Sequence, residues 1–426
     1  MDNKTYHTFL SILKQELIPA LGCTEPIAVA LAAAKARDVL GEFPGSLEIR
    51  CSGNIVKNVK GVTVPNSGGM KGIGAAAVLG VVGGKADASL EVLSGITEEQ
   101  RERTRKLLGS EFFSCKLEKN VDNLYVAATV RSKEHSATVT ILNRHTLISK
   151  IVRDGETLFE IKALLDSPKS VDKSLLNVKS IIEFAETVKL EEIDEPIGNQ
   201  IRMNTRISEY GLTNDFGTRV GHTLLKTQGS DTRTRAKARA AAGSDARMSG
   251  CALPVVINSG SGNQGLTVSL PVIEYAEHLK AGDEKLRRAL VISNLIAIHQ
   301  KKYIGSLSAF CGAVTAACGA GAAITYLCGG DYEKICNTIT NTIANVGGVI
   351  CDGAKPSCAA KIASSVDAAI MAHEMSMSGH VFHSGEGIVQ QNIESTIKSV
   401  GYVGRVGMKE TDVEILRIMT NEVKFS

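Results

Sequence analysis

The spacing of hydrophobic residues changes along the chain, and this change divides the sequence into two regions. Near the start, residues 5–21 and 25–41 carry apolar residues three and four positions apart, which predicts two helices. Between about residues 46 and 158, several runs alternate between apolar and polar or are rich in β-branched residues, which predicts strands. The predicted strands span 47–55, 124–130 and 136–148, and helices at 73–82 and 98–108 interrupt them.

From about residue 162 the apolar spacing is helical almost to the end of the chain. The predicted helices span 173–190, 217–226, 236–242, 285–300, 306–327, 332–345, 358–375 and 392–400. Clusters of Gly, Asn and Ser separate some of them, notably at 258–265 and 378–387. The sequence therefore predicts an α+β protein, with an N-terminal α/β domain over residues 1–165 and a large all-helical domain over residues 166–426.

Composition narrows the class of protein. The 426 residues favour two domains, and 43% hydrophobic with 22% charged residues is typical of a soluble globular protein. A net charge of +3 argues against nucleic acid or an anionic membrane as a partner. The uncharged run at 303–330 is long enough to span a bilayer, but its Gly, Ala, Ser and Thr content favours a buried soluble helix. The N-terminus lacks a secretory signal, so we expect a cytoplasmic protein.

Ten cysteines in a reducing compartment indicate metal binding or catalysis rather than disulfides. Cys351 and Cys358 flank a loop that contains a Gly and a Pro, and such a loop can turn both thiols toward one centre. Two buried thiols beside a turn are the alternative interpretation. Cys311 and Cys318 lie about 10 Å apart along one predicted helix, so only one of them fits a compact cluster.

Three cysteine ligands suit an iron–sulfur cluster with one iron left open, whereas a fourth is typical of electron carriers. An open iron can act on a substrate as a Lewis acid. Cys23 directly precedes a predicted helix, whose N-terminus favours a thiolate, although Glu25 opposes this by charge repulsion.

Two Gly-rich polar loops are candidate anion sites. Residues 66–72 lead into a helix and include Lys71, and residues 53–58 add donors upstream. Residues 258–265 contain a formal G-x-G-x-x-G pattern, but we expect neither a dinucleotide-binding helix after it nor a surrounding βαβ unit. Ordinary turns are the alternative for both loops.

Several segments together resemble the L-cysteine desulfidases, which are related to the α-type iron–sulfur L-serine dehydratases. They are GCTEP around Cys23, GNIVKN at 53–58, PNSGGMKG at 65–72, NSGSGNQG at 258–265 and CDGAKPSC at 351–358. The resemblance covers almost the whole chain. It implies conversion of L-cysteine to pyruvate, ammonia and hydrogen sulfide by a 4Fe–4S cluster, without pyridoxal phosphate. It also implies that Cys311, Cys351 and Cys358 bind the cluster and that Cys23 is the base, with Cys318 as the substitute for Cys311.

We expect a small amino acid as the substrate, no nucleic-acid or membrane partner, and a homodimer as the candidate assembly. Polar loop residues would hold the substrate carboxylate and stabilise enolate-like charge. They are Asn54, Lys57, Asn66, Ser67, Lys71, Asn258, Ser259 and Asn263. The alternatives are an L-serine dehydratase of the same fold, a non-catalytic iron–sulfur sensor, and a pyridoxal enzyme.

Overall fold

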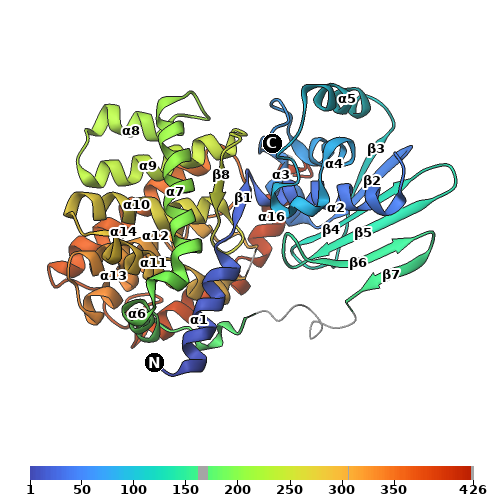
Figure 1. Ribbon diagram of the computed structural model, residues 1–426. Coiled ribbons are helices and arrows are strands. Elements are labelled where there is room, and N and C mark those ends of the chain that lie inside the picture. Colours follow the sequence, from blue (N-terminus) through green and yellow to red (C-terminus); the bar gives the residue numbers. More distant parts are fainter. Residues whose placement is uncertain (162–170, 306, 424–426) are drawn as a thin grey trace.

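The structure is a computed structural model that describes residues 1–161, 171–305 and 307–423. Two parts lie side by side in it (Figure 1). We call residues 24–160 the sheet part, and residues 173–407 without residue 306 the helical part. The predicted α+β class is confirmed, because the main sheet lies entirely in the first part and helices make up nearly all of the second. The predicted domain boundary at residues 165/166 lies outside the described residues.

A six-stranded sheet forms the core of the sheet part, in the order β3-β2-β4-β5-β6-β7. Strands β2 and β3 run parallel, and all other neighbours are antiparallel. Val126 and Ala128 lie opposite Ile141 and Val139 on the two central strands, and all four are fully buried. The alternation of apolar and polar residues thus gives the sheet one buried face. The strands are β2 (Ser46–Cys51), β3 (Phe113–Leu117), β4 (Tyr125–Arg131), β5 (Ser136–Leu142), β6 (Ile148–Arg153) and β7 (Glu156–Glu160).

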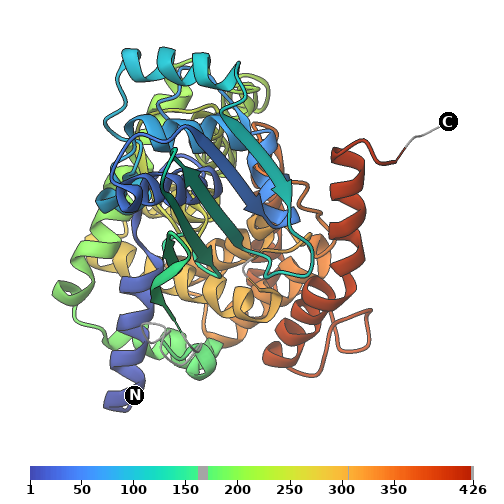
Figure 2. The same cartoon turned by 90° about the vertical axis from the view of Figure 1, so that its right-hand side faces the viewer.

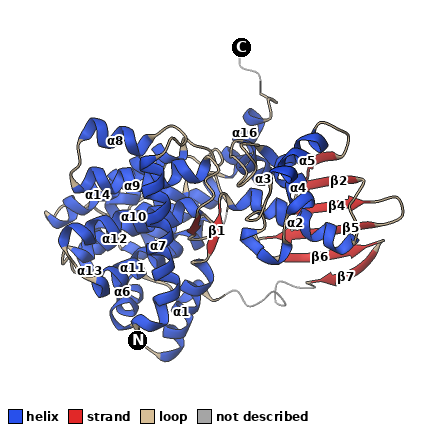
Figure 3. Cartoon of the chain, turned by 45° about the horizontal axis from the view of Figure 1, so that its top comes forward, coloured by secondary structure: helices blue, strands red, loops and turns tan. Residues whose placement is uncertain are grey.

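Helices cover the buried face of this sheet, as Figure 3 shows. Helix α2 (Thr24–Leu40) is rich in Ala and buried on nearly all sides, and it packs against α4 (Gly72–Gly83) and against β4 and β5. The two helices approach so closely that a Cβ on Gly80 would lie 2.4 Å from the carbonyl oxygen of Ala30. Small residues therefore permit this contact. The remaining helices of the sheet part are α3 (Gly53–Lys60), the 3₁₀ helix η1 (Ala86–Glu91) and α5 (Glu98–Leu108).

The helical part is built around α12 (Gly312–Leu327), which packs against four other helices, α10, α11, α13 and α14. Its Ala and Gly residues are almost all buried, which explains the uncharged run as a close-packed core helix. Across the described residues, no helix combines the length and apolarity needed to cross a bilayer. The other elements are η2 (Lys173–Leu175), α6 (Val178–Thr187), α7 (Leu190–Thr213), α8 (Val220–Gln228), α9 (Thr232–Met248), α10 (Gly262–Leu279), α11 (Asp283–Ile304), α13 (Tyr332–Val346), α14 (Cys358–Met377), α15 (Ile393–Tyr402) and η3 (Val403–Gly407).

Both ends of the chain cross between the two parts. Helix α1 (Asn3–Glu16) packs against α7 and α11, and β1 (Pro19–Leu21) pairs antiparallel with β8 (Pro254–Val256). At the other end, α16 (Lys409–Met419) packs against α3 and lies beside the sheet in the view of Figure 2. These crossings hold the loops that follow β1 and β8 next to each other.

Several predicted elements have different bounds in the structure. The predicted strand at 47–55 ends at Cys51, and α3 begins at Gly53 because Ile55 and Val59 are buried at helical spacing. The predicted strand at 136–148 is divided by a turn into β5 and β6. Helix α7 was not predicted, since Pro196 and a nearby Gly interrupt its pattern. The predicted helix at 306–327 begins at Gly312, and residue 306 itself lies outside the described residues.

Candidate active site

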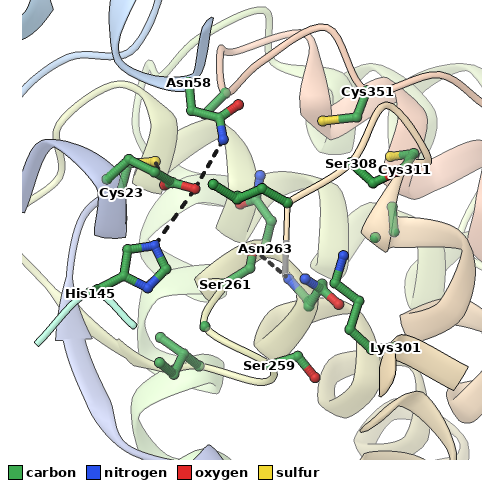
Figure 4. A pocket seen from close by; sticks show the side chains of 18 of the residues that line it. Cys23, Asn58, His145, Ser259, Ser261, Asn263, Lys301, Ser308, Cys311 and Cys351 are labelled. Atoms are coloured by element: carbon green, nitrogen blue, oxygen red, sulfur yellow. Dashed lines mark hydrogen bonds and ion pairs between the residues drawn. The ribbon is translucent and has the colours of Figure 1, made fainter. Parts of the chain in front are cut away.

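A cavity of about 510 Å³ lies where the sheet part meets the helical part. Its walls come from the turn before α2, the end of α3, the turn between β5 and β6, the loop before α10, and the segments around the starts of α12 and α14. Figure 4 shows Cys23 and His145 on one side of this cavity and Cys311 and Cys351 on the other. Segments more than 300 residues apart in the sequence therefore share one cavity.

Three cysteines line one region of the cavity, namely Cys311, Cys351 and Cys358. Cys311 is the N-cap residue of α12, and its N–H donates to the carbonyl oxygen of Val349 at 3.0 Å. The N–H of Cys351 donates to the carbonyl oxygen of Ala309 at 2.6 Å. These two hydrogen bonds make a short antiparallel bridge that places the two cysteines side by side. Cys358 opens α14, and its thiol donates to the carbonyl oxygen of Gly353 at 3.7 Å, across the intervening loop.

Burial, together with the neighbouring Cys351, raises the pKa of Cys311 to about 12. Burial also raises the pKa of Cys358. Without a bound cation these thiols therefore keep their protons, and a metal that binds them must displace the protons. Lys301 and Lys361 line the same cavity and add positive charge beside the thiols.

Over residues 1–161, 171–305 and 307–423, no three His, Cys, Asp or Glu side chains converge on one point as a mononuclear metal site requires. A 4Fe–4S cluster differs, because its cysteine ligands bind separate iron atoms. Three thiols spread over one wall of a cavity fit that donor set. Cys318 does not line the cavity: it is fully buried within α12 and its thiol donates to the carbonyl oxygen of Ile339 at 3.8 Å.

Cys23 is the N-cap residue of α2, and its thiol donates a hydrogen bond to Oε2 of Glu25 at 3.1 Å. Nδ2 of Asn58 donates to Oε1 of Glu25 at 3.1 Å, and Nε2 of His145 lies 3.8 Å from the same oxygen. Burial alone would raise the pKa of Glu25, but His145 and the Cys23 thiol outweigh it and lower the pKa to about 2. Glu25 is therefore an anion that accepts a hydrogen bond from Cys23.

The sequence set two opposing effects at Cys23, the helix N-terminus and the charge of Glu25, and in this arrangement the effect of Glu25 prevails. Burial and the charge of Glu25 raise the pKa of Cys23 well above its usual value, and Arg247 opposes them only in part. Desolvation and the adjacent carboxylate outweigh the field of the helix because both act directly on the sulfur. The raised pKa favours the protonated form of Cys23, and Glu25 is the acceptor of its hydrogen bond.

The 258–265 segment supplies two of its three predicted substrate residues to the cavity, Ser259 from the loop before α10 and Asn263 from the first turn of that helix. Asn258 is fully buried, and its Nδ2 donates to Oδ1 of Asn294 at 2.9 Å, so it holds the loop in place. The glycine pattern does lead into a helix, contrary to our expectation, since α10 begins at Gly262. Among the described strands, β8 pairs only with β1 and antiparallel, so no βαβ unit surrounds the loop.

The other predicted substrate residues lie outside the lining formed by the described residues. Lys57 is buried and pairs with Asp412 of α16. Nδ2 of Asn66 donates to the carbonyl oxygen of Leu93 at 2.8 Å. The remaining three are Asn54, which is half-buried on α3, Ser67, which bonds within its own turn, and Lys71, which is exposed. The structure does not bring these five residues to the cavity, because α3 and the turn before α4 direct them to other neighbours.

The structure also places polar residues in the cavity that the sequence did not single out. They include Glu25, which the sequence analysis considered only for its effect on Cys23, and Asn58, His145, Arg247, Gln264 and Lys301. Glu25, Asn58 and Gln264 lie within the GCTEP, GNIVKN and NSGSGNQG segments, so those segments carried a usable signal. His145 and Arg247 had none, since each reaches the cavity only through the packing of distant segments.

Comparison with known proteins identifies the class. A family model described as serine dehydratase alpha chain matches residues 87–417. The chain therefore belongs to the serine dehydratase alpha chain family. The resemblance to the iron–sulfur serine dehydratases is thus confirmed at the level of the family, and the narrower assignment to the cysteine desulfidases stays a prediction.

Relatives of nearly the same length share the whole chain. The UPF0597 protein of Lachnoclostridium phytofermentans is 54% identical over 416 residues, which cover 98% of this chain and 100% of the relative. The UPF0597 protein of Treponema denticola is 45% identical over 429 residues, covering 99% of this chain and 100% of the relative. That of Aeromonas salmonicida is 42% identical over 419 residues, covering 96% and 95%.

Proposed function

We propose that this protein is an iron–sulfur lyase that converts L-cysteine to pyruvate, ammonia and hydrogen sulfide. The observation that carries the proposal is the meeting of Cys311, Cys351 and Cys358 in one cavity that Cys23 also lines. These three thiols would hold a 4Fe–4S cluster. Such a cluster would supply an iron with a free position, which acts as a Lewis acid toward the substrate.

The residues around Cys23 account for proton removal. For Cys23 to act as a base, its thiol must first lose its proton, and the Glu25 carboxylate, which already accepts its hydrogen bond, is the neighbouring group that can relay this proton away from the sulfur. The thiolate can then take the α-proton of the substrate, and the β-substituent leaves with the bonding electron pair. Asn58 and His145 hold the Glu25 carboxylate in place through this exchange.

Positive charge in the cavity favours the carboxylate group of an amino-acid substrate and of the pyruvate product. Lys301 and Arg247 both line the cavity and are both buried. At low effective dielectric, such charges attract a carboxylate more strongly than they would at the surface. The aminoacrylate that forms after elimination hydrolyses in water to pyruvate and ammonia.

L-Serine is the second candidate substrate, and the family match favours it because the family description names a serine dehydratase. The GCTEP segment around Cys23 is the basis for preferring L-cysteine. With serine, hydroxide would leave in place of hydrosulfide, and the same residues would remove the α-proton.

Turnover of both substrates by protein reconstituted with iron and sulfide under anaerobic conditions tests this proposal. We expect the rates of pyruvate formation to give a higher kcat/KM for L-cysteine than for L-serine. With L-cysteine, one sulfide should be released per pyruvate. Cys23→Ser should lower kcat by a factor of about 10² or more, because a hydroxyl is a far weaker base than a thiolate. Cys251→Ser, at a buried cysteine outside the cavity lining, is the matched control.

Three results would contradict the proposal in different ways. A higher kcat/KM for L-serine would make the protein a dehydratase. An intact cluster with no turnover of either amino acid would favour the non-catalytic sensor. A cluster-free protein that forms pyruvate, with the visible absorption of an internal aldimine, would instead indicate a pyridoxal enzyme.

A further inference from the structure

The side chain of Arg247 is a buried cation that has no carboxylate partner within the described part of the chain. It lies near the end of α9, is only 1% exposed and lines the cavity. Its Nη1 donates to Oδ1 of Asn263 at 3.1 Å, while its Nε has no hydrogen-bond partner among the residues that the structure describes. None of the ion pairs in the described part of the chain includes Arg247.

An arrangement of this kind is costly for the protein alone. A guanidinium removed from water without an anion loses much of its hydration free energy, and a buried N–H without an acceptor adds to that loss. Arg239, a half-buried arginine on the same helix, is paired with Glu274 at 2.9 Å. Arg247 is more deeply buried and its Nε has no acceptor among the described residues, and an anionic ligand in the cavity that this side chain lines would balance its charge.

A second unpartnered group lies close to the first. Gln264 is 6% exposed and lines the same cavity, and its Oε1 has no hydrogen-bond donor among the described residues. Both groups adjoin the first turn of α10: Gln264 belongs to that turn, and a Cβ on Gly262 would lie 2.2 Å from Nε of Arg247. The N-terminus of this 18-residue helix adds partial positive charge at the same place.

Open donors beside an open acceptor match the two charged groups of an amino acid. A planar guanidinium binds a carboxylate through parallel N–H···O bonds, and an amide oxygen accepts from an ammonium group. Resting on the function proposed above, we propose that Arg247 and Gln264 bind the head group of the α-amino-acid substrate. Arg247 binds the α-carboxylate, and Oε1 of Gln264 accepts a hydrogen bond from the α-ammonium group.

The position of Arg247 suits the proposed chemistry. Burial raises the pKa of the Cys23 thiol, and the charge of Arg247 opposes this. Both side chains line the same cavity, so a carboxylate bound at Arg247 shares that cavity with Cys23. Gln264 in turn packs against the backbone just after Cys311, since a Cβ on Gly312 would lie 2.7 Å from Cδ of Gln264. The head-group site thus lies between the proposed base and a proposed cluster ligand.

Binding of three small probes to the full chain tests this inference without turnover. L-Alanine carries both head-group charges and no leaving group, L-alaninamide lacks the carboxylate, and propionate lacks the ammonium group. Ligand-detected NMR titrations should show that the wild-type protein binds L-alanine more tightly than either of the others. Arg247→Gln should weaken L-alanine binding by about 10- to 100-fold and abolish its advantage over L-alaninamide, because a charge-assisted pair is lost.

Further variants keep the test decisive. Arg247→Lys retains the charge without the paired N–H groups, so we expect intermediate affinity even if Arg247→Gln folds poorly. Gln264→Met should reduce the advantage of L-alanine over propionate and leave its advantage over L-alaninamide. Arg233→Gln, which removes a half-exposed arginine of α9 that pairs with Asp367, is the matched control and should bind as wild type.

The results separate this site from the proposed reaction. Wild-type affinity for L-alanine in Arg247→Gln would overturn the head-group site, as would equal wild-type affinities for L-alanine and L-alaninamide. Turnover of L-cysteine with unchanged KM in Arg247→Gln would overturn it as well and leave the lyase standing. An Arg247-dependent preference for L-alanine in a protein that turns over neither amino acid would support the site and remove the lyase.

Discussion

Replacement of Glu25 by Gln tests how the cavity controls the proton of Cys23. The carboxylate lies 3.1 Å from the sulfur, and at an effective dielectric constant of about 20 a thiolate at that distance is repelled by about 5 kcal/mol. Glu25→Gln removes this repulsion and keeps the size of the side chain. The Asn58 donor can still bond the amide oxygen, so the amide N–H₂ is left to face the sulfur and stabilise a thiolate. We therefore expect the variant to ionise Cys23 more readily.

Alkylation by iodoacetamide measures this ionisation, because the thiolate is the reacting form. The tryptic peptide of residues 15–35 contains Cys23 as its only cysteine, so mass spectrometry reports its rate separately. At pH 7.5 Cys23 should react at least about tenfold faster in Glu25→Gln than in the wild type. A tenfold change corresponds to only about 1.4 kcal/mol, which is well below the repulsion that the substitution removes. Turnover should nevertheless fall by about 10²-fold, since the proton acceptor for Cys23 is gone.

Glu16→Gln is the matched control, because Glu16 lines the same cavity but pairs with Lys173 instead of Cys23. It should leave the alkylation rate of Cys23 unchanged. An unchanged or slower rate in Glu25→Gln would refute the argument that this carboxylate holds the proton on the sulfur. Full turnover in Glu25→Gln would refute its role as proton acceptor.

Three further predictions concern stability and the head-group site. The pKa of Glu25 is lowered from 4.5 to about 2, so ionised Glu25 stabilises the fold by about 3 kcal/mol above pH 4.5. This stabilisation is lost as the pH falls toward 2, and urea unfolding should show the loss in the wild type and not in Glu25→Gln. Asp412→Asn leaves Lys57 buried without its anion and should cost about 3–5 kcal/mol in the same assay, and a cost below about 1 kcal/mol would contradict the pairing. Gly262→Ala should displace the guanidinium of Arg247 and weaken L-alanine binding as Arg247→Gln does, whereas wild-type affinity would show that Arg247 does not bind the probe.

Local patterns predicted the parts of the fold that depend on neighbouring residues. The start of α14 at Cys358 and the strand β4 follow directly from apolar spacing and turn residues. Helix α10 was missed because its first residues are glycine and polar and because it contains Pro271, yet burial of nearly the whole helix stabilises it. Tertiary packing thus overrode local preference there.

The cavity residues, too, divide into those that local sequence patterns could identify and those that only tertiary packing brings into place. Cys23, Cys351 and Cys358 could be singled out because cysteines beside helix starts and turns are chemically distinctive, whereas Cys311 was preferred to Cys318 only through the family resemblance. Lys57 could not be assigned from its motif, since its partner Asp412 lies 355 residues further along the chain.

His145 and Arg247 line the cavity but were not predicted to do so, because the residues around them in the sequence belong to no recognisable motif. His145 stands in the short turn between β5 and β6, and it meets Glu25 only because α2 packs on that edge of the sheet. Arg247 lies among the small residues at the end of α9, where nothing in the sequence marks it as unpaired. Only the packing of distant elements shows what each residue faces.

The account depends on three thiols binding one cluster. Iron and acid-labile sulfide, measured per chain after anaerobic reconstitution, test this directly in single Cys→Ala variants at positions 311, 351, 358 and 318. We predict that the first three variants lose the cluster and that the variant at Cys318 keeps wild-type iron and sulfide. Retention of the cluster in the variant at Cys311 together with its loss in the variant at Cys318 would contradict the account.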